Sequence, residues 1–553
     1  MSELTLHRAY HWESTRPDRV WLTQPTGGGP VRELTWAQAM DEARRMAAHL
    51  KALDFPPASN IALFSKNSAW WILADLAIWM AGHVSVPLYP TLAPDTIRQI
   101  LEHSGSVLVF VGKLDGFEAM KPGLPDDLPA IALPLSPPTD YESWDAIIGR
   151  TEPLEGTPRR SGDELATIVY TSGSTGTPKG VMQSFGSMSK CVSEVMNLLD
   201  VRDDDRMLSY LPLAHVVERI LIEQMTLYYG FPVFFAESLD TFVQDLNRAR
   251  PTVFVSVPRL WLKFQLGIFK KLPKKKLDLL LKIPLVRRII RKKVLGGLGL
   301  DACRVAISGS APIPAELIDW YRSLGLELLE AYGMSENFAW SHGNKPGNVK
   351  VGTVGTVQPG VECRLSDEGE ILVKSPGTMM GYYKEPELTA SVFTEDGFLK
   401  TGDRGVIEAS GHLRITGRVK ELFKTSKGKY VAPAPIENKL LSHELIEMAC
   451  VSGSGRPQPY AMVVLSEDGR AAARSEGNRA ELAASLDAHR AAINANLDKH
   501  ENVQLIVVIA EEWTIDNGKL TPTMKLKRGA IESDAGPHED GWYDAGASVV
   551  WHD

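Results

Sequence analysis

The residues most suited to chemistry lie in one glycine-rich stretch. Residues 170–180 read Tyr-Thr-Ser-Gly-Ser-Thr-Gly-Thr-Pro-Lys-Gly and directly follow an apolar run typical of a buried strand. Glycine lets the backbone approach a ligand closely, and hydroxyl groups, backbone amides and a lysine can all bind phosphate oxygens. We therefore predict a phosphate-binding loop between a buried strand and a helical segment. The residues suited to contact phosphate are Thr171, Ser172, Gly173, Ser174, Thr175, Gly176 and Lys179.

Two other interpretations of this stretch agree less well with its sequence. The P-loop of nucleoside triphosphatases requires Gly-Lys followed by serine or threonine, whereas Lys179 lies between Pro178 and Gly180. A flexible linker rich in serine, threonine and glycine rarely lies between a buried strand and a helix. The stretch therefore indicates a phosphate-binding loop of another kind.

The loop resembles the signature of the adenylate-forming superfamily, which includes acyl-CoA synthetases, adenylation domains and firefly luciferase. Other segments between Leu34 and Arg528 resemble later motifs of this superfamily, in the same order. These segments are 211–219 (Leu-Pro-Leu-Ala-His-Val-Val-Glu-Arg), 308–312 (Ser-Gly-Ser-Ala-Pro), 330–336 (Glu-Ala-Tyr-Gly-Met-Ser-Glu), 401–403 (Thr-Gly-Asp), 417–421 (Gly-Arg-Val-Lys-Glu) and 520–528 (Leu-Thr-Pro-Thr-Met-Lys-Leu-Lys-Arg). The Glu-Arg pair at 218–219 is typical of the long-chain branch. The resemblance implies the adenylate-forming enzyme fold and the activity of a fatty acyl-CoA synthetase.

The resemblance also implies which residues bind the nucleotide and its metal. Glu336 would bind Mg²⁺ together with the hydroxyl of Thr175. Ser335 stands where relatives more often have threonine, which keeps the hydroxyl group. The residues assigned to ATP or AMP are Ser310, Ala311 and Pro312 beside adenine, Tyr332, Gly333 and Ser335 around its ring, Asp403 at the ribose hydroxyls, and Arg418 near the nucleotide.

Further roles implied by the resemblance concern catalysis and the acyl and CoA sites. Lys525 would be the lysine required for adenylation, and Glu336 is the second residue assigned to catalysis. Met524 precedes Lys525 where many relatives have glycine, so Lys519 and Lys527 are competing candidates. The remaining assignments are Lys420 as the interdomain hinge, Gly428 at the CoA tunnel, His215 at the acyl pocket and Trp261 as the gate of the acyl tunnel.

The implied reaction has two steps. A fatty-acid carboxylate attacks the α-phosphate of ATP to give an acyl-adenylate, and the acyl group then passes to CoA, with AMP and pyrophosphate as the other products. Bringing two anions together requires positive charge, which Mg²⁺, Lys179 and Lys525 would supply. The alternatives are an acyl-AMP ligase that loads a carrier protein, a CoA ligase for another carboxylic acid, a luciferase-like oxygenase and a non-catalytic relative. The sequence defines neither the acyl chain length nor whether the protein is a monomer or a homodimer.

The elements that must position these residues fall into two predicted domains. Residues 1–418 alternate helix-like stretches, such as 36–50, with short β-rich runs, which is the pattern of layered α/β sheets. Short strands bounded by glycine predict a β-rich subdomain between 353 and 415. Residues 419–553 mix strands and helices and predict a small, mobile α+β domain, and the sequence leaves open whether the acidic tail at 532–553 packs on the rest.

A strongly basic segment follows Trp261. Residues 263–293 contain twelve Lys or Arg and one acidic residue, Asp278, interleaved with leucine, isoleucine, valine and phenylalanine. This combination suits contact with an anionic membrane, and a solvated surface is the alternative. Nucleic acid is not an expected partner, because no series of aromatic residues accompanies the charges and the whole chain has a net charge of −8.

The remaining features indicate a cytoplasmic protein, with peripheral contact at the inner face of the membrane. Residues 1–10 lack the basic and then apolar order of a signal peptide, and the four cysteines are too far apart in sequence to suggest a zinc site. The apolar composition of segment 69–90 resembles that of a membrane span. The segment is interrupted by Asp75 and Gly82, however, and we expect a buried helix followed by a strand.

Overall fold

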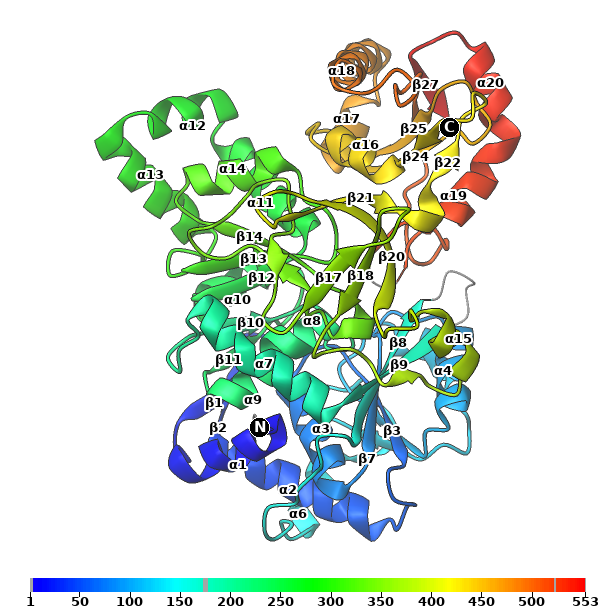
Figure 1. Ribbon diagram of the computed structural model, residues 1–553. Coiled ribbons are helices and arrows are strands. Elements are labelled where there is room, and N and C mark those ends of the chain that lie inside the picture. Colours follow the sequence, from blue (N-terminus) through cyan, green and yellow to red (C-terminus); the bar gives the residue numbers. More distant parts are fainter. Residues whose placement is uncertain (1–2, 173–177, 522–523, 553) are drawn as a thin grey trace.

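The computed structural model describes residues 3–172, 178–521 and 524–552. Figure 1 shows a large body formed by the N-terminal and central parts of the chain, with the C-terminal part (yellow to red) as a smaller unit above it. Sheets and helices are layered in the body, and the smaller unit has a sheet of its own. The predicted α/β class is therefore confirmed, while the domain boundary at residue 418 stays a prediction.

The largest sheet positions the predicted phosphate loop. In the described residues its strands lie in the order β19 (Gly381–Tyr382), β9 (Pro178–Ser184), β8 (Leu165–Ser172), β4 (Val84–Leu88), β3 (Asn60–Phe64), β5 (Leu108–Val111), β6 (Ala130–Ala132) and β7 (Glu142–Ser143). The strands from β8 to β7 are parallel, whereas β9 is antiparallel to both of its neighbours. Helices α2 (Trp36–Ala52) and α3 (Ala69–Ala81) pack against each other beside this sheet.

The apolar segment at 69–90 forms the predicted buried helix and strand. α3 begins after Ser68, whose side chain accepts a hydrogen bond from the backbone of Trp71, and ends at Gly82. Gly82 has φ of 91°, a conformation that favours glycine and ends the helix. Residues 69–80 are buried, and β4 follows directly. Among the described residues, no helix combines the length and apolar character that crossing a membrane requires.

The predicted phosphate loop connects two strands, so the expected order of strand, loop and helix is wrong. β9 follows the loop and pairs with β8 on one edge and with β19 on the other. β9 pairs with β8 along its whole length and with β19 at Val181 and Met182, and pairing on two edges favours a strand over a helix there. Helix α7 (Phe185–Leu199) begins only afterwards, where the side chain of Ser184 caps its first turn.

A second sheet forms one side of the predicted acyl region. Its strands in the described residues are β12 (Val253–Ser256), β13 (Val305–Ser308), β14 (Leu328–Tyr332), β15 (His342–Gly343) and β16 (Thr356–Val357). The first three are parallel, so their carboxyl ends meet at one edge. The connection from β12 to β13 contains α11 (Pro258–Lys271), α12 (Lys274–Leu281) and α13 (Pro284–Gly297). Figure 1 shows α12 and α13 projecting from the body as a hairpin, which we call the basic hairpin.

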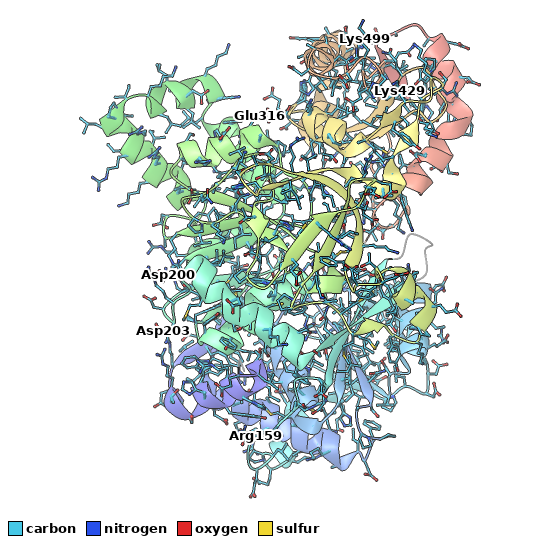
Figure 2. All side chains as sticks on the ribbon, viewed as in Figure 1. Arg159, Asp200, Asp203, Glu316, Lys429 and Lys499 are labelled. Carbon is cyan, nitrogen blue, oxygen red and sulfur yellow. The ribbon has the colours of Figure 1, made fainter. Side chains whose placement is uncertain are left out.

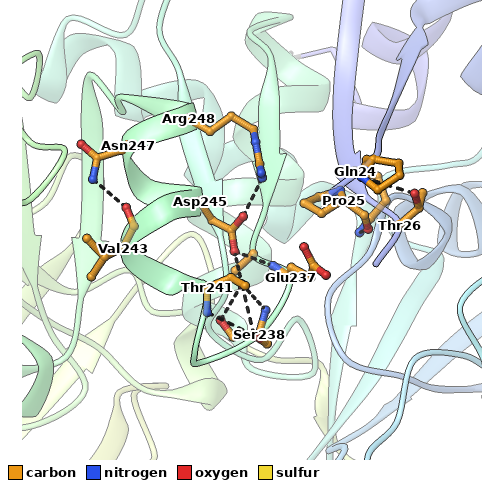
Figure 3. Close-up of polar contacts among 12 residues, drawn as sticks. Gln24, Pro25, Thr26, Glu237, Ser238, Thr241, Val243, Asp245, Asn247 and Arg248 are labelled. Carbon is orange, nitrogen blue, oxygen red and sulfur yellow. Dashed lines mark hydrogen bonds and ion pairs between the residues drawn. The ribbon is translucent and has the colours of Figure 1, made fainter. Parts of the chain in front are cut away.

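A buried carboxylate fixes the turn after β11 (Val233–Phe235), as Figure 3 shows. Asp245, in α10 (Phe242–Ala249), accepts hydrogen bonds at 2.8 Å from the backbone amide of Glu237 and from the hydroxyl of Thr241. Arg248 donates to its second carboxylate oxygen at 2.6 Å. These three donors compensate for burying the carboxylate. They anchor β11 beside β10 (Met207–Ser209), which leads into the predicted acyl-pocket motif at 211–219.

The predicted β-rich subdomain is confirmed. β17 (Glu362–Leu365), β18 (Glu370–Lys374), β20 (Leu399–Ile407) and β21 (Leu413–Arg418) lie side by side in this order, each antiparallel to the next. The turn at Val419–Glu421 connects this sheet to the C-terminal unit. Two of the predicted nucleotide-binding residues therefore lie on paired strands, Asp403 in β20 and Arg418 at the end of β21.

The C-terminal unit is an α+β structure. Its sheet has the order β24 (Ile446–Ser452), β25 (Tyr460–Leu465), β26 (Ile506–Ile509) and β27 (Val549–His552), and its helices include α16 (Pro433–Leu440), α18 (Glu476–Asn494), α19 (Arg528–Ala535) and α20 (Glu539–Asp544). β27 pairs with β26 and Trp542 is buried. The acidic tail, which the sequence left unplaced, is therefore part of this unit.

Candidate active site

The described part of the phosphate loop places Lys179 beside Tyr382. Lys179 lies opposite Thr171 in the β8–β9 hairpin, and its Nζ atom is 5.7 Å from the centroid of the Tyr382 ring. The other predicted phosphate contacts, Gly173, Ser174, Thr175 and Gly176, lie outside the described residues, as does the side chain of Ser172. Thr171 and Lys179 are thus the predicted phosphate ligands whose side chains the structure describes.

Tyr332, Asp403 and Arg418 form one hydrogen-bonded group. The hydroxyl of Tyr332 donates to Oδ2 of Asp403 at 2.6 Å, and Nε of Arg418 donates to Oδ1 at 2.9 Å. Burial and the charge of Asp403 both raise the pKa of Tyr332, so its hydroxyl remains a donor. The three side chains come from β14, β20 and β21, which places the residues predicted to contact adenine and ribose together.

Glu336 lies in the turn after β14 and is oriented by Tyr382. The hydroxyl of Tyr382 donates to Oε1 of Glu336 at 2.8 Å, and the backbone carbonyl of Ser335 accepts from Gln183 at 3.0 Å. A Cβ atom at Gly333 would lie 2.4 Å from the backbone carbon of Ala339, so the chain can make this turn only with glycine there. These contacts fix the orientation of the Glu336 carboxylate, four residues along the chain from Tyr332.

Lys525 approaches the same region from the C-terminal unit. Solvent still reaches its side chain, but the surrounding protein atoms lower its pKa, and the positive charge of Arg418 lowers it further. The carboxylates of Asp403 and Glu336 oppose these effects. The lysine predicted for adenylation therefore interacts with residues predicted to bind ribose and metal.

The structure also separates Lys525 from its two competitors. Lys519 forms an ion pair with Asp534, within the C-terminal unit, and Lys527 is exposed at the start of α19. Met524 has φ of 61°, in the left-handed region that favours glycine. Met524 therefore adopts a backbone conformation that glycine takes more readily, which costs about 1–2 kcal/mol.

An apolar pocket adjoins the hydrogen-bonded group at Tyr332. Its wall combines side chains from α7, from the segment after the 211–219 motif, and from the ends of β12, β13 and β14. The apolar lining consists of Val195, Leu198, Leu199, Leu211, Val217, Ile220, Leu221, Val255, Val257, Ile307, Leu329, Ala331, Ala339 and Trp340. Ser310, Tyr332 and Gly333 also line it. The sequence predicted a role for these last three alone. Leu211, Val217 and Ala331 lie within the quoted motifs, and the rest of the apolar wall comes from distant segments without a motif.

His215 and Trp261 occupy different environments. His215 precedes the short helix α8 (Val216–Glu218), and its Nδ1 accepts a hydrogen bond from the backbone amide of Val217 at 3.2 Å. Burial, and then the charge of Lys525, lower the pKa of His215 to about 3, so the ring is neutral. Trp261 is fully buried in a separate aromatic cluster with Phe254 and Tyr321. It does not line the apolar pocket, and its role as a gate stays a prediction.

The remaining predicted residues lie around the two units. Ser310 has φ of 67° and borders the apolar pocket, and Ala311 and Pro312 follow it on the surface. Lys420 is exposed in the turn that connects β21 to the C-terminal unit. Gly428 has φ of 73°, in a turn closed by its own backbone amide, which donates to the carbonyl of Thr425. The structure thus brings together the described residues that are predicted to bind the nucleotide, and it leaves Gly428 apart from them.

Sequence reasoning missed Glu330. It lies on β14, two residues before Tyr332, and burial raises its pKa to about 8. An acidic residue at the carboxyl end of a buried strand was the signal that could have found it, since carboxyl ends of parallel strands commonly border a ligand. Glu330 is therefore a further polar group at this edge of the second sheet.

Comparisons with known proteins agree with this arrangement. Residues 10–383 match the family described as AMP-binding enzyme, and residues 421–534 match the AMP-binding enzyme C-terminal domain. The long-chain-fatty-acid–CoA ligase FadD15 of Mycobacterium bovis is 32% identical over 94% of both chains. Long chain acyl-CoA synthetase 6 of Arabidopsis thaliana, a peroxisomal protein, is 30% identical over 90% of this chain and 80% of its own length.

Solved structures of adenylate-forming enzymes share the fold. The adenylation domain of a carboxylate reductase from Mycobacterium chelonae has a TM-score of 0.81 at 24% identity, covering 98% of this chain and 91% of its own. The anthranilate CoA ligase AuaEII, solved with anthranoyl-AMP, has a TM-score of 0.79 at 20% identity and covers 98% of both chains. The expected adenylate-forming enzyme fold is thereby confirmed.

Proposed function

Because this chain belongs to the AMP-binding enzyme family, we propose that it is a fatty acyl-CoA synthetase, an acid–thiol ligase that converts a fatty acid, ATP and CoA into acyl-CoA, AMP and pyrophosphate. One observation carries the proposal: Tyr332 both lines the apolar pocket and belongs to the hydrogen-bonded group around Asp403. An apolar acid bound in the pocket would therefore end with its carboxylate beside the nucleotide. The relatives described above are named as a long-chain-fatty-acid–CoA ligase and a long chain acyl-CoA synthetase, which supports a fatty acid as the substrate.

The first step requires cations around the reacting anions. Arg418 is close enough to Lys525 to lower the pKa of the lysine, and Lys179 lies beside Tyr382, which contacts Glu336. Glu336 offers a carboxylate that Tyr382 orients, and oxygen ligands of this kind suit Mg²⁺. When bound there, Mg²⁺ would supply positive charge at the phosphates. Asp403 would hold the ribose, and the neutral His215 would neither carry charge nor act as a base, since its Nδ1 is already an acceptor.

The second step requires the site to change. Lys525 belongs to the C-terminal unit and approaches the nucleotide residues, which suits adenylate formation. Between the units, Lys270 of α11 pairs with Asp468 at 2.7 Å, and Arg259 pairs with Glu447. These exposed pairs each contribute little, about 0–1 kcal/mol, and can break. We propose that rotation about Lys420 then withdraws Lys525 and brings the turn at Gly428 to the site, where the lack of a side chain leaves room for the pantetheine arm of CoA.

The molecule that accepts the acyl group distinguishes this proposal from its main alternative. The acceptor is CoA in the proposed reaction and a carrier protein in an acyl-AMP ligase. We expect purified protein with Mg²⁺-ATP to form CoA thioesters of hexadecanoate and dodecanoate, with higher kcat/KM than for acetate or benzoate. Each methylene transferred from water to the pocket contributes about 0.8 kcal/mol. AMP and thioester formation, followed together across the panel, provide the measurement. Adenylate formation without thioester would favour the carrier-protein ligase, and preference for acetate or benzoate would contradict the fatty acid.

The two half-reactions test the role of Lys525. We expect Lys525→Ala to slow adenylate formation by ~10²–10³-fold, the usual cost of removing one charge-stabilising donor. Thioester formation from supplied acyl-adenylate should change little, because the proposed rotation withdraws Lys525 before that step. Pyrophosphate release and thioester formation are measured separately. Lys527→Ala removes the same charge two residues away and serves as the control; a selective adenylation defect in that control would show that the assignment is wrong by two residues.

The basic hairpin formed by α12 and α13 provides a surface for an anionic membrane. Figure 2 shows its side chains pointing away from the body. Large apolar side chains are exposed among the cations: Leu285 is 85% exposed, Ile289 67% and Leu279 62%. Leu285 and Ile289 are four residues apart and therefore share one face of α13. We propose that these side chains enter the lipid headgroup region while the surrounding lysines and arginines bind anionic lipid.

Vesicle binding tests this surface. Replacing the three lysines at 274–276 by glutamine should weaken co-sedimentation with phosphatidylglycerol vesicles, with the larger effect at low salt, because exposed charges are screened beyond about 10 Å at 0.1 M. A control variant loses three exposed cations elsewhere, Lys121, Arg159 and Lys499. Equal binding by the two variants would contradict the proposed surface, and activity on soluble short acids should be the same in both.

A further inference from the structure

A fully buried ion cluster lies behind the wall of the apolar pocket. Nη2 of Arg219 is 2.5 Å from Oδ2 of Asp75 in α3, and its Nε is 3.1 Å from Oε2 of Glu223. All three side chains are inaccessible to solvent. The guanidinium also faces the ring of Trp71, 5.2 Å from its centroid, and donates to the hydroxyl of Thr167 at 3.2 Å. The cluster therefore joins the segment after the 211–219 motif to α3 and to β8.

The same segment provides part of the pocket wall. Val217, Ile220 and Leu221 line the pocket, so they alternate along the chain with the cluster residues Arg219 and Glu223. Residues 219–224 are wound as a π-helix between α8 and α9 (Met225–Tyr229). π-helical turns are rare and occur mostly as local insertions at functional sites. The pocket wall thus depends on a winding that the backbone alone does not favour.

A second set of contacts holds the preceding residue. Glu218 is buried and accepts hydrogen bonds from the hydroxyl of Ser209 at 2.8 Å, the backbone amide of Tyr210 at 3.0 Å and the side chain of Asn67 at 3.1 Å. Glu218 and Arg219 are therefore tied to different parts of the body. Consecutive anchors of this kind fix both the position and the rotation of the segment about its axis.

Stability alone gives no reason for such a cluster. Removing charges from water is costly, and well-packed apolar residues of similar volume usually stabilise a protein as much or more. Burial raises the pKa of Glu223 well above its ordinary value, the charge of Arg219 opposes this shift, and the neighbouring Asp75 raises the pKa further. The contact between Arg219 and Asp75 is the shorter one, at 2.5 Å against 3.1 Å for Glu223, and it includes a hydrogen bond, so it is the main ion pair of the cluster.

We propose that Arg219 and Asp75 are positioning residues for the acyl chain: their ion pair holds residues 219–224 in the π-helical winding that places Ile220 and Leu221 in the pocket wall. The proposal rests on the proposed function, in that the pocket is taken to hold the acyl chain. Neither residue touches the substrate. The two residues affect how well a long acyl chain fits the pocket. Replacing them should therefore change the selectivity for acyl chain length and leave the nucleotide site unchanged.

Single variants distinguish the role of Asp75 from that of Glu223. Asp75→Asn removes the charge that pairs with Arg219, and we expect the ratio of kcat/KM for hexadecanoate over octanoate to fall about tenfold, the effect of losing one or two methylene contacts in a pocket. The KM for ATP should stay unchanged within error. Glu223→Gln keeps the shape of the side chain and leaves the shorter Arg219–Asp75 contact in place, so its ratio should match that of the wild type. Loss of selectivity in Glu223→Gln, with none in Asp75→Asn, would overturn the assignment.

A double variant covers the case in which Asp75→Asn does not fold, since it leaves a buried cation unpaired. Arg219→Met with Asp75→Leu removes both charges, and thermal unfolding should show a folded protein of similar stability. We expect the same loss of chain-length selectivity with an unchanged KM for ATP. A folded double variant with the wild-type ratio would show that the cluster does not position the acyl chain. A wild-type protein that activates no fatty acid would instead contradict the proposed function.

Discussion

The repulsion between a carboxylate and the phosphates of ATP constrains every part of this site. Two unit charges 4 Å apart repel by about 1 kcal/mol in water and by about 4 kcal/mol near a protein surface. The chain places Arg418 and Lys525 close enough for the arginine to lower the pKa of the lysine. Two neighbouring cations favour an anion between them, which supports the proposed binding of phosphate at this position. Asp403 and Glu336 limit this excess of positive charge and are held by the hydroxyls of Tyr332 and Tyr382.

Arg418 and Lys525 come from different parts of the chain, and this difference explains how one site can serve the two proposed reaction steps. Arg418 ends the last strand of the β-rich subdomain, whereas Lys525 belongs to the C-terminal unit, beyond the turn that contains Lys420. A charge that is needed in only one step is thus carried by the part of the protein that is proposed to move. The acyl chain has the opposite requirement, because a hydrocarbon gains most from a wall that stays fixed. The buried pair of Arg219 and Asp75 lies in the body, away from the proposed movement.

The sequence was sufficient for the features that are local and ordered along the chain. The helix at 69–81, the β-rich subdomain and the placement of Lys525 beside the nucleotide residues followed from periodicity or from ordered motifs. Met524 stands where the resemblance led us to expect glycine. Its φ of 61° lies in the region that favours glycine, so the backbone conformation at this position is the one expected for glycine. The helix expected directly after the phosphate loop was wrong, because pairing of β9 on both of its edges depends on Gly381 and Tyr382, far away in sequence.

The features that the sequence could not provide depend on contacts between distant residues. Arg219 and Asp75 are 144 positions apart, and neither residue type indicates by itself that the two will meet. The pocket wall likewise combines side chains from Val195 to Trp340. Trp261 was predicted at the acyl tunnel, but a tryptophan on a helix is equally suited to a core, and here it packs with Phe254 and Tyr321.

The most direct test of the proposed acyl-adenylate mechanism traces a carboxylate oxygen from the fatty acid into AMP. If a carboxylate oxygen attacks the α-phosphorus of ATP, hexadecanoate labelled with ¹⁸O in both carboxylate positions must leave one ¹⁸O in AMP at each turnover. The bond from carbonyl carbon to that oxygen breaks when the thiol of CoA attacks the acyl-adenylate. Mass spectrometry of AMP and pyrophosphate should find the label in AMP and none in pyrophosphate. Unlabelled AMP, or label in phosphate or pyrophosphate, would contradict an acyl-adenylate and with it the role given to the cations of this site.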